Sequence, residues 1–357
     1  MKFDQVLKVA VHGGASDIIL KLGSLPRFRH DGRLVSLTDG KVISPEIMQE
    51  WIHQVVPQSL LAKLTEDGDC DFAYELSKKS RFRVNVFKQQ KNYGMVLRVL
   101  SNHIKTLEEL QMPKIIQEFT KAKRGLILVT GATGSGKTTT LAAMIEKINI
   151  DRSAHIITIE DPIEFLFSDK NSTINQREIG TDVRSFASAL KASLRQSPDV
   201  ILVGELRDKE TTETALMAAE TGHLVISTLH TVDAVDSLTR LMSYFSPHQH
   251  TAIRNQLANT LNAVVSQRLV NRIDNIGRVP ALEIMVVNSL IRDCIIKENS
   301  FTPIADAIQR GNESYGMQSF DQSLLQLYQK KVISKEQAID QATSRENMKL
   351  LISGVSR

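Results

Sequence analysis

The sequence contains little that could crosslink the chain or hold it in a membrane. Its two cysteines, Cys70 and Cys294, lie far apart in the 357 residues and form no C-x-x-C pair. This excludes a disulfide framework and a cysteine-rich zinc site, and is typical of a reducing compartment. No apolar run approaches the roughly 18 residues of a membrane-spanning helix, and Lys2 and Asp4 interrupt the region where a signal peptide would be apolar. We therefore expect a cytoplasmic protein without a transmembrane segment, whose membrane contact, if any, is made through a partner.

Aromatic residues and excess charge are also scarce. Phe, Trp and Tyr make up 5% of the chain, and the net charge is only +4. Single-stranded nucleic acids are usually bound by a basic groove with interleaved aromatic side chains, so no nucleic-acid partner is expected. The remaining composition, 42% hydrophobic and 24% charged, is ordinary for a globular protein. A chain of this length is more typical of two domains than of one.

Residues 1–100 have the mixed patterns of a small α+β domain. Helical spacing occurs at residues 3–10 and 46–64, and strand-like runs occur at residues 18–22, 69–75, 81–87 and 94–100. Apolar and polar residues alternate in the third of these runs, so Arg81 and Arg83 share one face, and Arg98 lies on the following strand. The pattern alone leaves two interpretations of these arginines: an ordinary solvated sheet face or a functional surface.

Residues 101–113 have the character of a linker, and residues 114–357 form the second expected domain. Apolar strand-like runs at residues 126–130, 155–160, 200–205 and 224–229 alternate with helical patterns at residues 139–148, 186–194 and 211–219. Such alternation is typical of a parallel sheet covered by helices on both faces. The segments 247–271 and 317–352 are predicted to be helical.

A complete phosphate-binding motif follows the first of these strands. The segment from Gly131 to Thr138 has the spacing G-x-x-x-x-G-K-[ST] between a strand and a helix. Its glycines let backbone N–H groups surround an anion, and the helix N-terminus adds donors and a favourable dipole. Lys137 would reach the β- and γ-phosphates of a nucleoside triphosphate, and the Thr138 hydroxyl would ligate Mg²⁺. The predicted nucleotide-binding residues are Gly131, Ala132, Thr133, Gly134, Ser135, Gly136, Lys137, Thr138 and Thr139.

Polar residues that could support hydrolysis follow three other strands. Glu205 comes after the run 200–203 and Glu160 ends the run 155–159, so both are expected at the carboxyl edge of the sheet, where a Mg²⁺ ligand or water activator would lie. His230 follows the run 224–229 and could sense the γ-phosphate at the same edge. For the nearby Arg207 and Asp208, a functional role and a simple surface pair are equally plausible.

The order of these motifs resembles the secretion and type IV pilus ATPase superfamily. The segments 131–138, 158–165, 194–208 and 221–230 match its phosphate loop, Asp box, Walker B and His box in the family's order, and the segments 14–17 and 81–87 resemble it as well. The similarity covers nearly the whole chain and is strongest to the retraction ATPases of type IV pili. It implies Mg²⁺-dependent ATP hydrolysis by a homohexamer that powers pilus retraction and docks on an inner-membrane pilus platform.

The resemblance also implies details that the patterns do not contain. The N-terminal domain would be PAS-like and the larger domain RecA-like, with ATP bound between them. Arg81, Arg83 and Arg98 would complete the ATP site from the N-terminal domain.

The chain departs from the family pattern at three places. Ala132 stands where proline is frequent, Val232 stands where the family has asparagine, and the retraction motif Ala-Ile-Arg-Asn-Leu-Ile is only partly kept at residues 290–295. An accessory retraction motor or a secretion ATPase of the same superfamily therefore remains open. Alternatives of other classes are a nucleic-acid motor on a RecA-like core and a nucleotide-gated scaffold without turnover.

Overall fold

The computed structural model describes residues 2–30, 33–37, 40–77, 80–100, 103–274, 277–297 and 301–354. Its contacts divide the chain into two compact units. Unit 1 comprises Met1–Ile104 together with Asp161–Leu166 and Arg177–Arg184, and unit 2 comprises Lys105–Glu160, Phe167–Gln176 and Ser185–Arg357. No helix in the described ranges has both the length and the apolar character needed to cross a bilayer.

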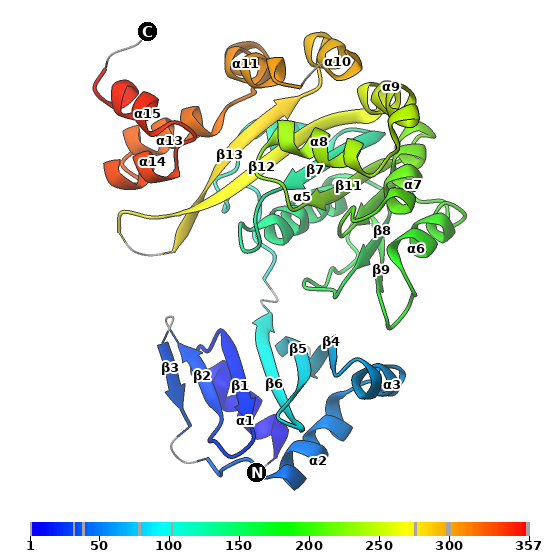
Figure 1. The fold of residues 1–357 in the computed structure, drawn as a ribbon, viewed down its shortest axis with the longest axis vertical. Coiled ribbons are helices and arrows are strands. Elements are labelled where there is room, and N and C mark those ends of the chain that lie inside the picture. The colour runs from blue at the N-terminus through cyan, green and yellow to red at the C-terminus, as the bar shows by residue number, and fades with distance from the viewer. Residues whose placement is uncertain are drawn as a thin grey trace. The chain divides into compact units, whose positions relative to one another are not determined.

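Unit 1 contains a six-stranded antiparallel sheet with the order β3-β2-β1-β6-β5-β4 (Figure 1). Its core joins sheet residues such as Phe72 and Phe82 to helix residues such as Phe3 and Trp51, all at most 1% exposed. The elements are α1 (Phe3–His12), β1 (Asp17–Lys21), β2 (Arg27–His30), β3 (Arg33–Ser36), α2 (Pro45–Val55), α3 (Gln58–Glu66), β4 (Asp69–Ser77), β5 (Ser80–Gln89) and β6 (Asn92–Leu100).

The predicted helix at residues 46–64 is wrong as a single element. Helix α2 ends at Val55 and α3 begins at Gln58, with Pro57 between them. Proline has no N–H to donate, and its ring disfavours the helical conformation of the residue before it. Val56 accordingly has an extended backbone with ψ 123°.

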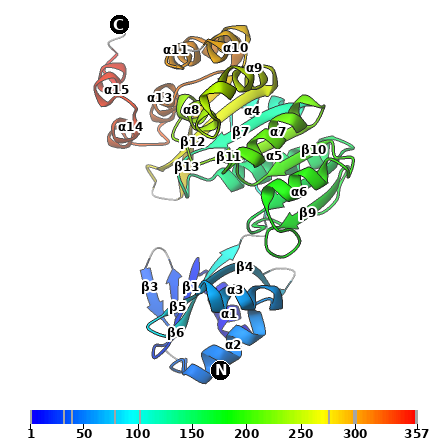
Figure 2. The same cartoon turned by 45° about the vertical axis from the view of Figure 1, so that its right-hand side comes forward.

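Unit 2 is built around a sheet with the order β13-β12-β7-β11-β10-β8-β9. The strands from β12 to β8 run parallel, and β13 returns antiparallel to β12. Every residue of β7 and β11 is buried, because helices cover both faces of the sheet (Figure 2). The strands are β7 (Gly125–Thr130), β8 (His155–Glu160), β9 (Thr173–Glu178), β10 (Val200–Val203), β11 (Leu224–Leu229), β12 (Leu261–Asn271) and β13 (Arg278–Val286).

The helices of this unit confirm the expected alternation along the chain. Helices α4 and α5 pack on one face of the sheet through a shared apolar core. The helices are α4 (Lys114–Thr120), α5 (Lys137–Asp151), α6 (Phe186–Ser193), α7 (Lys209–Glu220), α8 (Ala234–Ser243), α9 (His250–Thr260), α10 (Ser289–Ile296), α11 (Pro303–Arg310), α12 (Asn312–Tyr315), α13 (Phe320–Gln329), α14 (Lys335–Gln341) and α15 (Arg345–Ile352), with a 3₁₀ turn at Pro247–Gln249.

The prediction that residues 247–271 are helical is wrong in its second half. Helix α9 ends at Thr260, and β12 follows at once, paired with β7 on one side and β13 on the other. A short apolar run fits a buried strand as well as a buried helix, so its periodicity could not decide between them. The strands β9 and β13 were not predicted either. Helices in the segment 317–352 are confirmed; α13, α14 and α15 gather beside the β12–β13 hairpin (Figure 1).

Candidate active site

The phosphate loop joins β7 to α5, and its glycines give it its shape. Gly131, Gly134 and Gly136 have φ values of 142°, 80° and 90°, which a residue with a Cβ rarely adopts. A Cβ on Gly131 would lie 2.4 Å from the carbonyl oxygen of Gln267, whereas one on Gly134 would meet nothing within 4 Å. The loop is therefore packed tightly against β12 at one end and open near Gly134.

The start of α5 offers donors that a phosphate could accept. Gly136 is the N-cap, and among the described residues no side chain caps the first N–H groups of the helix. The Ser135 hydroxyl is buried and has no hydrogen-bond partner among the residues that the structure describes. Uncapped helix donors and an orphaned hydroxyl suit a bound anion. Thr138 and Thr139 are half-buried in the first turn, while Ala132 and Thr133 are exposed in the loop.

Lys137 is the first residue of α5, and its side chain folds back over the loop. Its ammonium group donates to the carbonyl oxygens of Gly131 at 2.8 Å and Ala132 at 3.1 Å. Lys137 is only 9% exposed, so these contacts compensate for much of its lost hydration. The ammonium group is thereby held over the loop that would cradle the phosphates.

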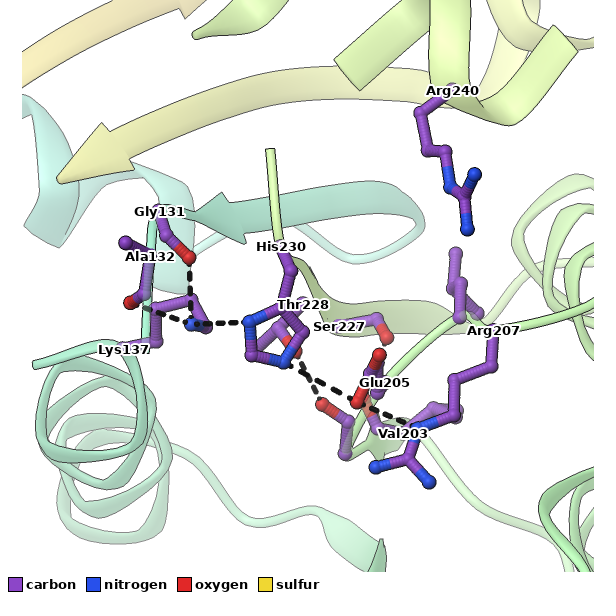
Figure 3. Close-up of polar contacts among 12 residues, drawn as sticks. Gly131, Ala132, Lys137, Val203, Glu205, Arg207, Ser227, Thr228, His230 and Arg240 are labelled. Carbon is purple, nitrogen blue, oxygen red and sulfur yellow. Dashed lines mark hydrogen bonds and ion pairs between the residues drawn. The ribbon is translucent and has the colours of Figure 1, made fainter. Parts of the chain in front are cut away.

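His230 links this lysine to the carboxylate of Glu205 (Figure 3). The Lys137 Nζ lies 3.4 Å from His230 Nδ1, and His230 Nε2 lies 3.5 Å from a Glu205 carboxylate oxygen. Because an ammonium group can only donate, Nδ1 is the acceptor and the ring proton belongs on Nε2, which faces Glu205. The structure thus brings three predicted residues into one row: Lys137 from the start of α5, and His230 and Glu205 from beyond the ends of β11 and β10.

Hydroxyl groups hold the backbone around Glu205 in place through hydrogen bonds to its carbonyl oxygens (Figure 3). Ser227 and Thr228 of β11 donate to the carbonyl oxygens of Val203 at 2.6 Å and Gly204 at 2.7 Å. Tyr244 donates to the carbonyl oxygen of Leu206 at 3.0 Å. These bonds hold the segment on both sides of Glu205, whose own side chain is only 19% exposed.

The neighbours of Glu205 have separate tasks. The Arg207 guanidinium donates to the Glu205 carboxylate at 2.8 Å. Asp208 instead accepts the backbone N–H of Thr211 at 2.8 Å and caps α7. The two residues whose roles the sequence left open are therefore an ion-pair partner of Glu205 and a helix cap.

Glu160 lies at the end of β8, the strand beside β10. It is 7% exposed, and its carboxylate accepts hydrogen bonds from Thr158 at 2.6 Å and Gln176 at 3.2 Å. Its position at the carboxyl edge confirms the expected placement, while its role in catalysis stays a prediction.

The three predicted arginines belong to unit 1 and lie on the polar face of its sheet. Arg98 and Arg83 pair across β6 and β5, and Arg98 Nε lies 3.1 Å from Asp17. Arg83 lies 3.6 Å from Glu164, which is part of the same compact unit. Arg81 is 7% exposed, and one of its guanidinium nitrogens has no partner in the described part of the chain. Any contact of these arginines with phosphate stays a prediction.

The sequence patterns did not reveal the residues that support the site. Thr228 lies inside the recognised His box, but nothing in that motif marked it as a backbone anchor. Gln267 contacts the phosphate loop and was missed because its segment was assigned to a helix. A residue of this kind is recognised only when the neighbouring strand is known.

Comparisons with known proteins identify the family of this chain. A family model described as "Type II/IV secretion system protein" matches residues 2–354. The chain is 39% identical over 352 residues to the type IV pilus ATPase PilU of Pseudomonas aeruginosa, covering 99% of this chain and 91% of that protein. It is 40% identical over 351 residues to the type IV pilus retraction ATPase PilT of the same organism, covering 97% and 100%.

A solved structure supports the fold as well. The crystal structure of the pilus retraction motor PilT with bound ADP has a TM-score of 0.89 and 42% identity, covering 97% of this chain and 98% of that one. This match confirms the expected class: a RecA-like parallel-sheet domain preceded by a smaller PAS-like α+β domain. With a family model that spans almost the whole sequence, the chain belongs to the type II/IV secretion system protein family.

Proposed function

We propose that this protein is an ATPase motor that couples ATP hydrolysis to the retraction of type IV pili. The observation that carries this proposal is the row of Lys137, His230 and Glu205 at the carboxyl edge of a parallel sheet. In this row an ammonium group and a carboxylate lie on either side of one imidazole. The similarity to PilT and PilU supplies the pilus as the object of the work.

The phosphate loop would bind the nucleotide. Lys137 would transfer its donors from the loop carbonyls to the β- and γ-phosphates, and the N–H groups around Gly134 and Gly136 would surround the phosphate oxygens. Thr138 would contribute its hydroxyl to Mg²⁺. The ion, when bound, would neutralise charge that develops on the phosphates.

The acidic residues would prepare the attacking water. Glu205 would orient the water and accept its proton, because its carboxylate is held in place by Arg207 and by the pinned backbone. His230 would contact the γ-phosphate and report its presence to Glu205. Glu160, at the adjacent strand end, would support the ion or the water.

The remaining parts of the proposal concern assembly. We expect a homohexamer in which Arg81, Arg83 and Arg98 contact the phosphates, so that nucleotide state changes the arrangement of the ring. The ring would work in the cytoplasm and reach the inner membrane through a pilus platform protein. No nucleic-acid partner is expected.

The decisive experiment is deletion of the gene followed by microscopy of pili. We expect abundant pili that do not retract, with motility restored by the wild-type gene and not by Glu205→Gln. Loss of pili would indicate an extension motor, and normal pili with impaired secretion would indicate a secretion ATPase. Either result would contradict the proposal.

An accessory retraction motor is a second candidate, because the retraction motif is only partly kept at residues 290–295. The identities to the pilus ATPases PilU and PilT, 39% and 40%, are nearly equal. The test is to express this protein as the only retraction ATPase in the cell. Retraction under these conditions indicates the principal motor, whereas retraction only beside a second ATPase indicates the accessory one. ATPase stimulation by DNA that falls steeply with salt would indicate a nucleic-acid motor instead.

A further inference from the structure

Gln267 is the buried residue that holds the phosphate loop from behind. It lies on β12 and is 3% exposed. Its amide nitrogen donates to the carbonyl oxygen of Ser135 at 2.7 Å, and its amide oxygen accepts from the Thr140 hydroxyl at 2.8 Å. One side chain therefore joins the loop to the first turn of α5.

The chemistry of these partners determines how the amide is oriented. A backbone carbonyl can only accept, so the nitrogen of Gln267 must face Ser135, and its oxygen then faces Thr140. A glutamate at position 267 could not replace it, because a carboxylate has no proton to donate to Ser135. The position therefore requires a side chain of this shape that offers both a hydrogen-bond donor and an acceptor, as the glutamine amide does.

The backbone of the loop fits closely against Gln267. A Cβ on Gly136 would lie 2.7 Å from the side-chain amide nitrogen of Gln267, and a Cβ on Gly131 would lie 2.4 Å from the backbone carbonyl oxygen of Gln267. Two glycines of the motif are therefore needed for contact with β12, in addition to their positive φ values. The third, Gly134, has no such neighbour within 4 Å.

The contact with Ser135 also aims a phosphate donor. The Ser135 carbonyl and the Gly136 N–H belong to one planar trans peptide and point in opposite directions. Because Gln267 holds the carbonyl, the Gly136 N–H points away from β12. Losing the amide would free this peptide to rotate.

The strand that carries Gln267 is held from its other face. Arg268, whose side chain alternates to the opposite side, donates to the carbonyl oxygen of Gln341 at 2.7 Å and stacks 3.8 Å from the centre of the Phe320 ring. The C-terminal helices thus anchor the strand on which the loop rests.

We propose that Gln267 is a positioning residue for ATP binding, which acts through the phosphate loop without touching the nucleotide. It keeps the Ser135–Gly136 peptide in the orientation that presents its N–H to phosphate. This inference rests on the proposed ATPase function and extends it to a residue outside the recognised motifs.

The test compares variants of the full-length protein in the binding of a fluorescent ADP analogue and in ATP turnover. Gln267→Leu leaves the buried Ser135 carbonyl unpaired, so we expect the Kd and KM to rise about tenfold, with a smaller change in kcat. Thr140→Val should weaken binding less, because the Ser135 contact remains, and Thr140→Ser should retain most of the affinity.

The control is Val265→Ala, which removes apolar volume from the same strand at a position paired with Val129 of β7, before the loop begins. Val265 is fully buried in the sheet core, so this variant should lower the Tm as Gln267→Leu does but leave the Kd within about twofold, since a cavity in the core acts on stability. Equal weakening of binding by Val265→Ala would show a general loss of stability and overturn the inference. So would wild-type affinity in Gln267→Leu.

The outcomes separate this inference from the proposed function. Absence of ATP turnover in the wild-type protein contradicts the ATPase proposal, whereas the ADP analogue still reports the role of Gln267. If Gln267→Leu does not fold, the Thr140 pair decides: equal affinity of Thr140→Val and Thr140→Ser overturns the inference, and a loss confined to Thr140→Val supports it.

Discussion

Lys137 is the residue on which the proposed nucleotide binding would depend most directly. Its ammonium group is already directed by two loop carbonyls, so little rearrangement is needed for it to meet phosphate. This is a preorganised cation in a mostly buried position, where a charge-assisted hydrogen bond is strong.

Replacing this lysine should therefore abolish measurable turnover. Lys137→Ala removes the contact with the β- and γ-phosphates, and we expect roughly a tenfold to hundredfold weaker affinity for ATP, from the usual strength of hydrogen bonds to charged groups. Equilibrium binding and phosphate release measure the two effects. Lys147→Ala, on the same helix and paired with Asp151 at 3.0 Å, is the matched control and should behave as wild type.

The buried carboxyl group of Glu283 should make the stability of the protein depend on pH. Burial is the main cause that raises the pKa of this carboxyl to about 7. The hydrogen bond that the carboxylate accepts from the Ala234 N–H lowers the pKa. Among the nearby charges, Asp233 and Asp321 raise the pKa and Arg268 lowers it. The folded protein therefore holds its proton to higher pH than the unfolded chain does. Stability should fall as the pH rises from the unfolded pKa through about 7.

The variant Glu283→Gln should remove this dependence. Its amide oxygen can still accept the Ala234 N–H, and no charge is buried. We expect the free energy of unfolding to exceed that of wild type by up to about 3 kcal/mol at pH 8 and by much less at pH 5. Urea unfolding at both pH values measures the difference; an equal difference at both would contradict the buried charge as its cause.

At the scale of elements, side-chain caps fix where the helices begin after the site segments. Asp208 caps α7 directly after the Glu205 segment, and Asp233 caps α8 directly after His230. The side chain of each accepts a backbone N–H of its helix, which also directs the preceding loop toward the edge of the sheet.

Removal of one cap should be measurable as a loss of stability. Asp208→Ala leaves the Thr211 N–H without its acceptor, and we expect about 1 kcal/mol of destabilisation. Thermal or urea unfolding of the full-length protein measures this destabilisation. Glu210→Ala, in the first turn of the same helix with an exposed partner in Lys191, should change stability by less than about 0.5 kcal/mol.

The elements also show where periodicity is informative. The mostly apolar strands β7, β8, β10 and β11 were predicted because they are short runs that alternate with helical patterns along the chain. Strand β12 was assigned to a helix because α9 runs into it without a turn residue. Its identity as a strand depends on hydrogen bonds to β7 and β13, partners that are distant in the chain.

At the scale of the whole molecule, substitution of the arginines of unit 1 would test whether nucleotide turnover needs both units. Arg83→Gln removes a cation from the polar sheet face, and we expect at least tenfold lower kcat if it stabilises charge on the phosphates. Arg27→Gln, an exposed arginine on β2 of the same sheet, is the control. Sedimentation must show the same assembly for both variants; unchanged kcat in an intact assembly would exclude Arg83 from the site.

The sequence by itself determined the nucleotide chemistry of this protein. The spacing of the phosphate loop needs only local geometry, since a strand, a glycine turn and a helix start are contiguous in the chain. The carboxyl ends of parallel strands meet at one edge, which was enough to bring Glu160, Glu205 and His230 toward the loop. The match to a known family then supplied the work that the hydrolysis performs.

Only the tertiary structure decided which side chains hold that chemistry in place. Thr228, Tyr244 and Gln267 act through hydrogen bonds to backbone groups far away in the sequence. No local pattern encodes such a bond, because its partner is chosen by the order of strands in the sheet. The proposed phosphate-binding loop can be recognised from the sequence alone. Gln267, which supports the loop, can be identified only from the structure, in which β12 lies beside β7.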